Sequence, residues 1–467
     1  MSGLTQLQAM GTAERRKEAR TVIASSYLGS TIEYYDFLLY ATAAAVVFPK
    51  VFFSGMDDWV GVVAAYGTFA AGYVARPLGG IIFGHFGDRV GRKGMLIVSM
   101  LVMGVASTLI GLVPGASVVG PWGAVMLVIL RVFQGIAVGG EWGGAALMAL
   151  EHSESGRRGF AASFVNAGAP TGAVLGTFIL GAFSSLPNDQ FLAWGWRVPF
   201  LLSFVLLGVG MFVRLKVSES PIFKAALEQE KREQEDAEQA EGDQAEGDQA
   251  EGAQGSAAPV RREIPLLQVL RRPKTLIFTM LAGAAGFALQ VVLATFAVTF
   301  AVSKGADRQG VLYAYAAASL VSIVFVVLGG RLSDKLGRRP VMVGGLLVFI
   351  TYLVPMFQLL SSNNIMLIFV AFAVGLMIHS TLFGPLAAFV SEQFGTTSRY
   401  TGASLGYQLA TLLGAGFTPG IVAQIFKDSG QNTGSVVWYL AIMSVVSIVF
   451  ILLTREPRNN DLQTVRP

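Results

Sequence analysis

GHFGDRVGRK, residues 84–93, returns in the other half of the chain as GRLSDKLGRR, residues 330–339. In both copies a Gly, an Asp, a base, a second Gly and two further bases occupy the same register. Each copy lies between two long apolar runs. A charged stretch repeated in this way between apolar runs is typical of two structurally repeated helical bundles. The repeat therefore predicts a chain built from two similar halves.

Apolar runs dominate the rest of the chain. Hydrophobic side chains make up 53% of the 467 residues and charged ones only 14%, and the mean hydropathy is +0.58. Since about 20 apolar residues suffice to cross a bilayer, we expect an all-α membrane protein with about twelve transmembrane helices in two bundles of six. The expected spans are 21–48, 59–83, 94–113, 122–149, 160–184, 197–216, 274–302, 309–330, 339–360, 364–391, 401–426 and 434–454.

The chain divides into five expected parts: a tail at 1–20, a bundle at 21–216, a linker at 217–273, a bundle at 274–454 and a tail at 455–467. Acidic side chains crowd residues 228–251, which hold too little apolar surface to fold. We interpret this segment as a solvated tether, with an acidic docking segment as the alternative. Basic residues gather in the first tail and in alternate loops, which places both termini in the cytoplasm.

Several kinds of chemistry are not expected. Cysteine is absent and histidine occurs three times, so neither a thiolate nor a histidine-cluster metal site is predicted. A phosphate-binding Gly-x-x-x-x-Gly-Lys-Ser/Thr loop and a His-Glu-x-x-His zinc motif are also missing. We therefore expect no enzyme, no cofactor, no metal and no nucleic-acid partner, and a proton gradient as the source of energy.

Two carboxylates, Glu33 and Asp36, lie in the first expected span. An ionisable side chain near the bilayer centre costs about 3 kcal/mol on insertion scales, so both must point into the bundle. Three residues apart, they share one helix face. We predict that at least one carries the transported proton, and the alternative is a structural pair satisfied by a neighbouring helix. The adjacent Tyr34, Tyr35 and Tyr40 are candidate substrate ligands.

The fourth expected span carries Arg131, Gln134 and Glu141. Arg131 can bind an organic anion through two parallel hydrogen bonds, or it can hold a carboxylate of the first span in its charged form. A buried structural counter-ion is the alternative. Gln134 and Glu141 lie two turns apart on one face, where we predict substrate contact for Gln134 and proton coupling for Glu141.

Polar residues on other spans complete the predicted cavity. His379 lies in the middle of the tenth span, and a histidine that titrates near neutral pH can relay protons or bind substrate. A neutral packed histidine is the alternative. Further candidate substrate ligands are Asn166, Gln290, Tyr407 and Gln408, although hydrogen bonding between helices explains them equally well.

The repeated basic stretch has the composition of a gate. Its Asp can accept from backbone N–H groups at a helix start, its second Gly permits a tight turn, and its arginines can bridge to acidic helix ends. We predict a latch that closes when the carrier faces outward; bases that only fix topology are the alternative. The predicted gating residues are Arg76, Gly84, Asp88, Arg89, Gly91, Arg92, Asp334, Gly337 and Arg338. Because Lys335 replaces the first Arg in the second copy, we expect Asp88 and Arg89 to matter more.

These motifs resemble the major facilitator superfamily, through both basic stretches and Arg131-x-x-Gln134-Gly135. Glu33-Tyr34-Tyr35-Asp36-Phe37, Arg76-Pro77-Leu78-Gly79-Gly80 and Gly195-Trp196-Arg197-Val198-Pro199-Phe200 resemble its metabolite:proton symporter family. Residues 139–146 and His379 resemble the shikimate transporter branch, in which Asp replaces Glu33. The resemblance covers the chain apart from the acidic linker and the tails. It implies proton-driven uptake of a small organic acid or zwitterion by alternating access.

The leading hypothesis is a monomeric proton-coupled symporter in the bacterial inner membrane that imports a small carboxylate. Shikimate-like hydroxy acids come first, and dicarboxylates and aromatic acids follow. A zwitterionic osmolyte such as proline or betaine is the alternative, disfavoured because no heptads follow Glu456. A non-transporting metabolite sensor is a different class, for which the linker offers no structured partner-binding segment. In the leading mechanism, a proton on Glu33 or Asp36 frees Arg131 to bind the substrate anion.

Overall fold

The structure, a computed structural model, describes residues 12–90, 92–151, 153, 155–216, 265–271, 273–394, 399–456 and 458. Side chains are described for these residues except 12–20, 84–90, 92, 93, 151, 155, 216, 265 and 268. Most of both predicted tails and the acidic linker therefore lie outside the described residues. The same holds for Gly91 and for the side chains of Asp88, Arg89 and Arg92, and the roles predicted for these residues and for Gly84 remain predictions.

Every secondary-structure element in the described part of the chain is helical. The N half, residues 12–216, contains α2 (Thr12–Val46), α3 (Phe48–Phe52), α4 (Asp58–Val90), α5 (Arg92–Ile110), α6 (Ala116–Val119), α7 (Trp122–Gly139), α8 (Glu141–Glu151), η1 (Ser155–Arg157), α9 (Arg158–Phe183), α10 (Asn188–Gln190), η2 (Phe191–Gly195), α11 (Arg197–Leu201) and α12 (Ser203–Lys216). The C half, residues 265–454, contains α14 (Pro265–Arg271), α15 (Pro273–Ala294), α16 (Phe296–Ser303), α17 (Arg308–Leu336), α18 (Arg338–Leu360), α19 (Ile365–Ser391), α20 (Arg399–Thr411), η3 (Leu412–Gly416), α21 (Thr418–Asp428) and α22 (Thr433–Leu453).

Nine helical stretches among the described residues are long and apolar enough to cross a membrane. Four of them join two or more elements, such as α7 with α8 over Trp122–Leu150 and α15 with α16 over Pro273–Ser303. The first three expected spans, which correspond to α2, α4 and α5, are not among the nine. The apolar part of α5, Gly94–Ile110, is shorter than the others. The chain is thus all-helical with many membrane-spanning candidates, and the number twelve remains a prediction.

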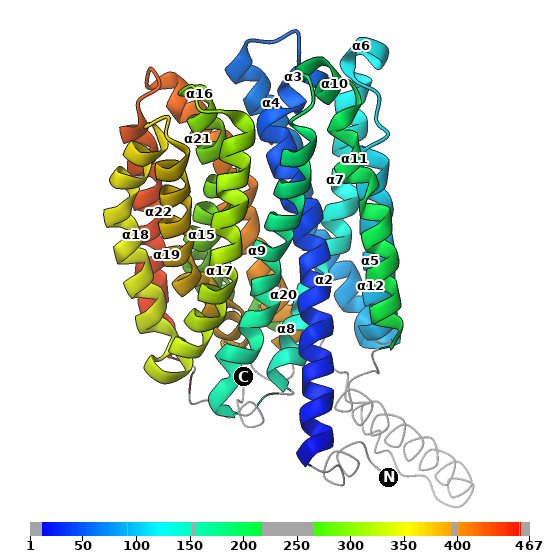
Figure 1. Ribbon diagram of the computed structural model, residues 1–467. Coiled ribbons are helices and arrows are strands. Elements are labelled where there is room, and N and C mark those ends of the chain that lie inside the picture. Colours follow the sequence, from blue (N-terminus) through cyan, green and yellow to red (C-terminus); the bar gives the residue numbers. More distant parts are fainter. Residues whose placement is uncertain are drawn as a thin grey trace, which may run out of the picture.

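The helices form two groups that lie side by side (Figure 1), with the blue-to-green N half next to the light-green-to-red C half. Across the boundary, α9 packs against α17 and α19, α4 against α20 and α21, and α2 against α15 and α16, while α8 contacts α19 and α20. We call this surface between the halves the seam. Because side chains from both halves meet along it, the seam is where a substrate path between the halves would run.

The basic stretch differs from the expected loop. Its first seven residues in the second copy, 330–336, continue α17, and the chain turns only at Gly337. Gly337 has a φ of +102°, a conformation that favours glycine because a side chain would be strained there. In the first copy α4 likewise continues to Val90. In the second copy the stretch is therefore a helix end followed by a one-residue turn.

Glycines allow α4 and α7 to pack at very short range. A side chain at Gly135 would collide with the Gly72 carbonyl oxygen, and one at Gly139 with the Arg76 carbonyl oxygen. Small residues such as Gly135 and Gly139 permit this backbone contact between membrane helices. The contact brings Arg76 of α4 close to the polar face of α7, and so helps to build the site described next.

Candidate functional site

Arg131 is fully buried in the N half among aromatic rings. Its guanidinium carbon lies 3.9 Å from the centroid of the Phe37 ring and 4.1 Å from that of Tyr40. Its Nη1 donates to Gln134 Oε1 at 2.8 Å, and Gln134 in turn donates to the Ser107 hydroxyl. Nε and Nη2 of Arg131 have no hydrogen-bond partner among the described residues. The aromatic faces stabilise the cation, yet half of its donor edge remains free for an anion.

Arg76 contacts the same aromatic cluster from α4. Its guanidinium carbon lies 4.0 Å from the Phe37 centroid and 4.3 Å from the Tyr73 centroid. Only 2% of Arg76 is exposed, and its Nε has no partner within the described residues. The sequence suggested a gating role for Arg76, which remains a prediction. The structure brings Arg76 to the Phe37 ring that Arg131 also contacts, so two buried guanidinium groups share one aromatic side chain.

Glu33 and Asp36 are both buried on α2, as predicted. Asp36 accepts a hydrogen bond from the Ser203 hydroxyl at 2.6 Å, while its second oxygen has no partner among the described residues. No hydrogen bond or ion pair to Glu33 is formed within the described part of the chain. Two buried carboxylates without a bonded cation are costly when charged, which suits groups that bind and release protons.

Glu141 has a different environment from the one predicted. It forms a buried ion pair with Arg214 of α12, and the Ser99 hydroxyl lies 3.5 Å from its second oxygen. The pair satisfies Glu141 within the N half, whereas the prediction had it available for proton coupling. Arg214 was not singled out from the sequence. Its position in an apolar run, next to Phe212, Val213 and Leu215, was the available signal.

The three tyrosines predicted as substrate ligands differ in their hydrogen-bond partners. The Tyr35 hydroxyl donates to the Pro199 carbonyl at 2.6 Å, and the Tyr40 hydroxyl donates to the Thr68 hydroxyl at 2.7 Å. Both hydrogen bonds are therefore formed within the N half. The Tyr34 hydroxyl instead reaches across the seam to the Tyr407 hydroxyl at 2.7 Å. Among the three, Tyr34 is thus the one that faces the other half.

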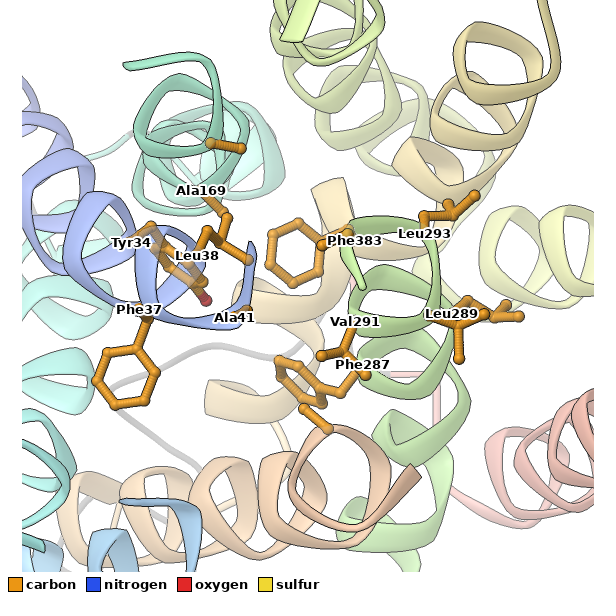
Figure 2. Packing of buried hydrophobic residues seen from close by; sticks show 14 of the residues in the cluster. Tyr34, Phe37, Leu38, Ala41, Ala169, Phe287, Leu289, Val291, Leu293 and Phe383 are labelled. Carbon is orange, nitrogen blue, oxygen red and sulfur yellow. The ribbon is translucent and has the colours of Figure 1, made fainter. Parts of the chain in front are cut away.

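Aromatic stacking closes the middle of the seam. The Tyr407 ring stacks on Trp142 of α8 with centroids 3.5 Å apart, and Phe287 of α15 meets Tyr407 edge-on at 4.8 Å. Figure 2 shows Phe287 and Phe383 of the C half facing Tyr34 and Leu38 of α2. Tyr407 was predicted to bind substrate; here its ring fills the space between the halves. A substrate that enters the seam must part this cluster.

Two other predicted ligands bridge the seam through backbone carbonyls. Asn166 donates to the Phe383 carbonyl at 2.6 Å, and Gln408 donates to the Gly139 carbonyl at 3.3 Å. Close by, Tyr400 donates to the Gly140 carbonyl at 2.9 Å. The helix is interrupted between α7 and α8 at these glycines, so their carbonyl oxygens can accept hydrogen bonds from the other half. The alternative considered for Asn166 and Gln408, bonding between helices, is the arrangement present.

Ser404 lies beside this contact, in a stretch whose spacing matches an enzyme motif. Residues 402–406, Gly-Ala-Ser-Leu-Gly, have the spacing of the nucleophile elbow of serine hydrolases. An elbow requires a sharp turn between a strand and a helix, whereas these residues all lie inside α20. Ser404 instead packs across the seam against Gly143 of α8. The match is therefore a coincidence of spacing.

His379 and Gln290 line a small hollow on the C side of the seam. The His379 ring bonds through Nε2 to the Gly286 carbonyl at 2.9 Å and stacks on Phe383 with centroids 5.1 Å apart. The hollow has a volume of about 10 Å³. This is about the space of one water molecule. His379 is therefore packed and hydrogen-bonded, and it also borders the seam.

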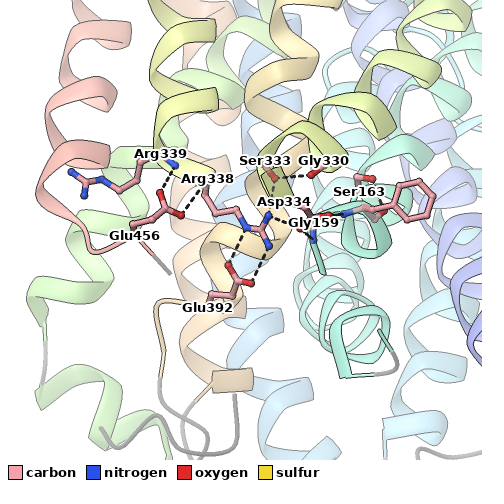
Figure 3. A network of polar contacts seen from close by, with 10 residues as sticks. Gly159, Ser163, Gly330, Ser333, Asp334, Arg338, Arg339, Glu392 and Glu456 are labelled. Atoms are coloured by element: carbon pink, nitrogen blue, oxygen red, sulfur yellow. Dashed lines mark hydrogen bonds and ion pairs between the residues drawn. The ribbon is translucent and has the colours of Figure 1, made fainter. Parts of the chain in front are cut away.

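Asp334 forms a charge-assisted polar contact across the seam (Figure 3). Its two carboxylate oxygens accept from the backbone N–H groups of Gly159 and Phe160, each at 2.8 Å. These groups belong to the first turn of α9, where free donors and the helix dipole favour an anion. The prediction that the Asp accepts at a helix start matches this geometry, although the helix belongs to the other half of the chain.

Arg338 holds Asp334 in place from the C half. Its Nη1 donates to Asp334 at 2.7 Å, and its other nitrogens lie 3.2 Å and 3.3 Å from the Glu392 carboxylate oxygens. Burial raises the pKa of the Glu392 carboxyl, and the Arg338 guanidinium opposes that rise. Glu392 directly follows α19, so Arg338 bridges to an acidic helix end as predicted. We call Asp334, Arg338, Glu392 and the start of α9 the latch.

The C-terminal end of the described chain supports the latch. Glu456 accepts from the backbone N–H groups of Arg338 and Arg339 at 2.8 Å and 2.9 Å, which caps the start of α18. Lys335, by contrast, is exposed. The substitution of Lys for Arg at this position therefore does not weaken the contacts of the second copy, which use Asp334 and Arg338.

The halves also touch at the end opposite the latch. The Tyr66 hydroxyl lies 3.2 Å from that of Thr299, and Trp59 packs against Phe426 with ring centroids 5.3 Å apart. Contacts therefore connect the halves at both ends and in the middle. Such a form encloses the buried charges of the N half, and access to them requires the halves to separate at one end.

Comparison with known proteins agrees with this architecture. A family model described as Major Facilitator Superfamily matches residues 37–404 and 305–467. The chain is 36% identical to the inner membrane metabolite transport protein YhjE of Escherichia coli K12, over 94% of this chain and 95% of YhjE. It is 34% identical to the shikimate transporter of the same organism, again over 94% and 95%.

Solved structures share the fold. The proton:xylose symporter XylE bound to 6-bromo-6-deoxy-D-glucose superposes with a TM-score of 0.71, covering 95% of this chain and 99% of XylE, at 17% sequence identity. The long apolar helices and the relatives agree on a multi-pass membrane protein that is a transporter and not an enzyme. The chain belongs to the major facilitator superfamily.

Proposed function

We propose that this protein is a proton-coupled symporter that imports a small organic acid, with a shikimate-like hydroxy acid favoured, by alternating access. The observation that carries the proposal is the buried pair Arg76 and Arg131, whose guanidinium groups retain unpartnered donors within the described chain. Two buried carboxylates, Glu33 and Asp36, occupy the same half. Free guanidinium donors suit a carboxylate substrate, and the carboxylates suit a coupled proton.

In the proposed cycle, Asp36 or Glu33 takes up a proton from outside while the halves are parted at the end opposite the latch. Neutralising the carboxylate removes a competitor for the guanidinium groups, so Arg131 becomes available to the substrate anion. The halves then close and part at the other end, where loss of the proton restores the competition and releases the substrate. Proton and acid therefore travel together, because each lowers the cost of burying the other.

The relatives support the choice of substrate class. A shikimate transporter is among the proteins to which this chain is similar over nearly its whole length. We further propose the complete topology of the superfamily: twelve spans, two bundles of six at 21–216 and 274–454, both termini in the cytoplasm, and a functional monomer in the bacterial inner membrane. The latch then lies at the cytoplasmic end, and we propose that Asp88, Arg89 and Arg92 form its counterpart.

Uptake assays test the function. Cells that express the chain are given labelled shikimate, 2-oxoglutarate, protocatechuate or proline, with and without a protonophore. We expect concentrative uptake of shikimate that the protonophore abolishes. Uptake of proline alone would move the substrate class to zwitterions, and binding without flux would indicate a sensor.

Variants test the proton role. Glu33→Gln or Asp36→Asn should abolish concentrative uptake while exchange of internal for external substrate persists, because exchange needs no net proton movement. Ser444→Ala, a buried change on α22 away from the charges, is the matched control for insertion and folding. Wild-type accumulation by both carboxylate variants would remove the proton role from this pair.

A further inference from the structure

The small hollow on the seam has two chemically different walls. The N half contributes apolar or backbone surface, from Leu38, Ala169, Pro170 and Ala173. The C half contributes the polar groups, which are Gln290, Tyr315, Ser319, Ser322, His379 and Ser380. Because one wall belongs to each half, separation of the halves widens the hollow beyond the single water molecule that its volume of about 10 Å³ admits.

The three serines have already used their protons. Ser319 donates to the Tyr315 carbonyl at 2.9 Å, Ser322 to the Ser319 carbonyl at 2.8 Å, and Ser380 to the Leu376 carbonyl at 2.7 Å. A hydroxyl has one proton and two lone pairs. Each serine oxygen therefore faces any new partner as an acceptor.

His379, which also lines the hollow, has an acceptor atom as well. Its Nε2 bonds to a carbonyl oxygen, which can only accept, so Nε2 carries a proton. In the neutral ring the proton is absent from Nδ1, which leaves Nδ1 as an acceptor. No described carboxylate forms an ion pair with this buried ring, so the neutral form is the one that the site accommodates. Gln290 and Tyr315 are then the side chains of the lining that can donate, against four acceptors from Ser319, Ser322, Ser380 and His379.

We propose that this acceptor-rich wall is a substrate subsite that binds hydrogen-bond donors, that is, the hydroxyl groups of a hydroxy acid. The inference rests on the proposed function and deepens it: the carboxylate end of the substrate belongs to the N half, and the hydroxyl end belongs to Ser319, Ser322 and His379 of the C half. A second carboxylate would meet more acceptors than donors and would lose most of its hydration without replacement. The subsite therefore selects hydroxy acids against dicarboxylates.

An ammonium group also donates hydrogen bonds, yet it fits less well. No Asp or Glu lines the hollow to balance a positive charge. A buried charge without a counter-ion is far more costly than a buried hydroxyl. Betaine has no N–H group to donate to this wall, and its positive charge would find no counter-ion there. Hydroxyl groups are thus the donors to which this wall is suited.

A matched pair of ligands provides the test. Shikimate and cyclohex-1-ene-1-carboxylate share the ring and the carboxylate, and only shikimate has the three hydroxyls. Each hydroxyl that finds an acceptor contributes about 1 kcal/mol, so three correspond to roughly 100-fold in affinity. We expect cyclohex-1-ene-1-carboxylate to compete for labelled shikimate uptake at least about 100-fold more weakly than unlabelled shikimate, and 2-oxoglutarate to compete weakly as well.

Alanine variants connect this selectivity to the wall. Ser322→Ala should weaken the affinity for shikimate about 2- to 10-fold and reduce the ratio of that affinity to the one for cyclohex-1-ene-1-carboxylate, the deoxy analogue. If this variant does not insert into the membrane, Ser319→Ala should have the same effect. Ser444→Ala is the control, because Ser444 is also buried and also donates one turn back, to Leu440, but does not line the hollow. It should leave both affinities unchanged.

The outcomes separate the subsite from the function. Equal competition by the deoxy analogue, with uptake still driven by protons, overturns the subsite and leaves the symporter standing. The subsite is also overturned if Ser322→Ala lowers thermal stability but keeps the wild-type ratio of affinities, since a structural water would then explain the hollow. Proton-driven uptake of 2-oxoglutarate but not of shikimate likewise overturns the subsite alone. Absence of uptake for every acid overturns both.

Discussion

Replacing Asp334 by Asn should open the latch end of the seam. Asp334 accepts two backbone hydrogen bonds from α9 at 2.8 Å each. Asn is nearly isosteric, but it is neutral, retains one acceptor oxygen and turns an N–H₂ group toward the second donor. A hydrogen bond to a charged group contributes about 1.5–3 kcal/mol and a neutral one about 1 kcal/mol. Loss of one bond and weakening of the other gives about 2–5 kcal/mol, or roughly 30- to 5000-fold in the open-to-closed equilibrium.

Cysteine labelling measures that equilibrium. The chain has no native cysteine, so a single introduced thiol reports without background. Ser404→Cys is suitable, because Ser404 is buried on α20 near the latch end and faces α8 across the seam. Its reaction with a membrane-impermeant maleimide, in inside-out vesicles, follows the open fraction. We expect Asp334→Asn to raise the labelling rate by the factor above, up to the rate of a fully exposed thiol.

Two control variants separate opening of the latch from a general loosening of the structure. Asp428→Asn removes a carboxylate that is exposed and bonded only to Gln424 of its own helix among the described residues, and it should leave the rate unchanged. Thr299→Cys, at the other end of the seam, should not become faster in the Asp334→Asn background. An unchanged Ser404→Cys rate would refute the latch. Faster labelling at both ends would indicate general loosening, and would refute it too.

Three further predictions concern contacts elsewhere. Glu141→Gln leaves Arg214 buried without its counter-ion and should cost about 3–5 kcal/mol, seen as a lower melting temperature in detergent, and the double variant with Arg214→Gln should recover part of the loss. Tyr407→Phe removes the bond to Tyr34 but keeps the ring stack, so initial uptake rates should change less than about 10-fold, whereas a total loss of uptake would show that the hydroxyl is functional. Glu456→Gln weakens the cap of α18 and should cost about 1 kcal/mol in thermal unfolding; an unchanged melting curve contradicts the capping role.

Local chemistry could be predicted from the sequence. The turn at Gly337 follows from a glycine next to charged residues at the end of an apolar run, and the structure has the required positive φ there. Burial of Glu33 and Asp36 follows from the cost of charge in lipid. The capping action of Asp334 was also within reach, because it depends on the side chain itself. What the local pattern does not specify is the partner, which here is α9 rather than the helix that follows.

Side-chain partners that lie far apart in the sequence could not be predicted from it. Glu141 and Arg214 lie 73 residues apart and meet only because α8 and α12 belong to one bundle. Apolar helices of similar length carry no code for which faces touch, so Glu141 appeared free. Arg131 shows the same limit: its charge was predicted to matter, but the stack with Phe37 requires knowledge of how α2 faces α7. Sequence periodicity defines a face, and only packing defines what it meets.

The two halves repeat a fold but not a distribution of charge. Among the described residues the buried charged side chains of the C half, Arg338, Glu392 and Arg399, all lie at the latch end, whereas Glu33, Asp36, Arg76 and Arg131 lie inside the N half. Bonds that cross the middle of the seam, such as those of Tyr34 and Asn166, are neutral and contribute about 1 kcal/mol each. The middle can therefore part at low cost, while the charge-assisted latch governs closure at its end. Because no buried ion pair between described residues has to be broken across the middle, binding of proton and substrate inside the N half can tip the balance between the two open forms.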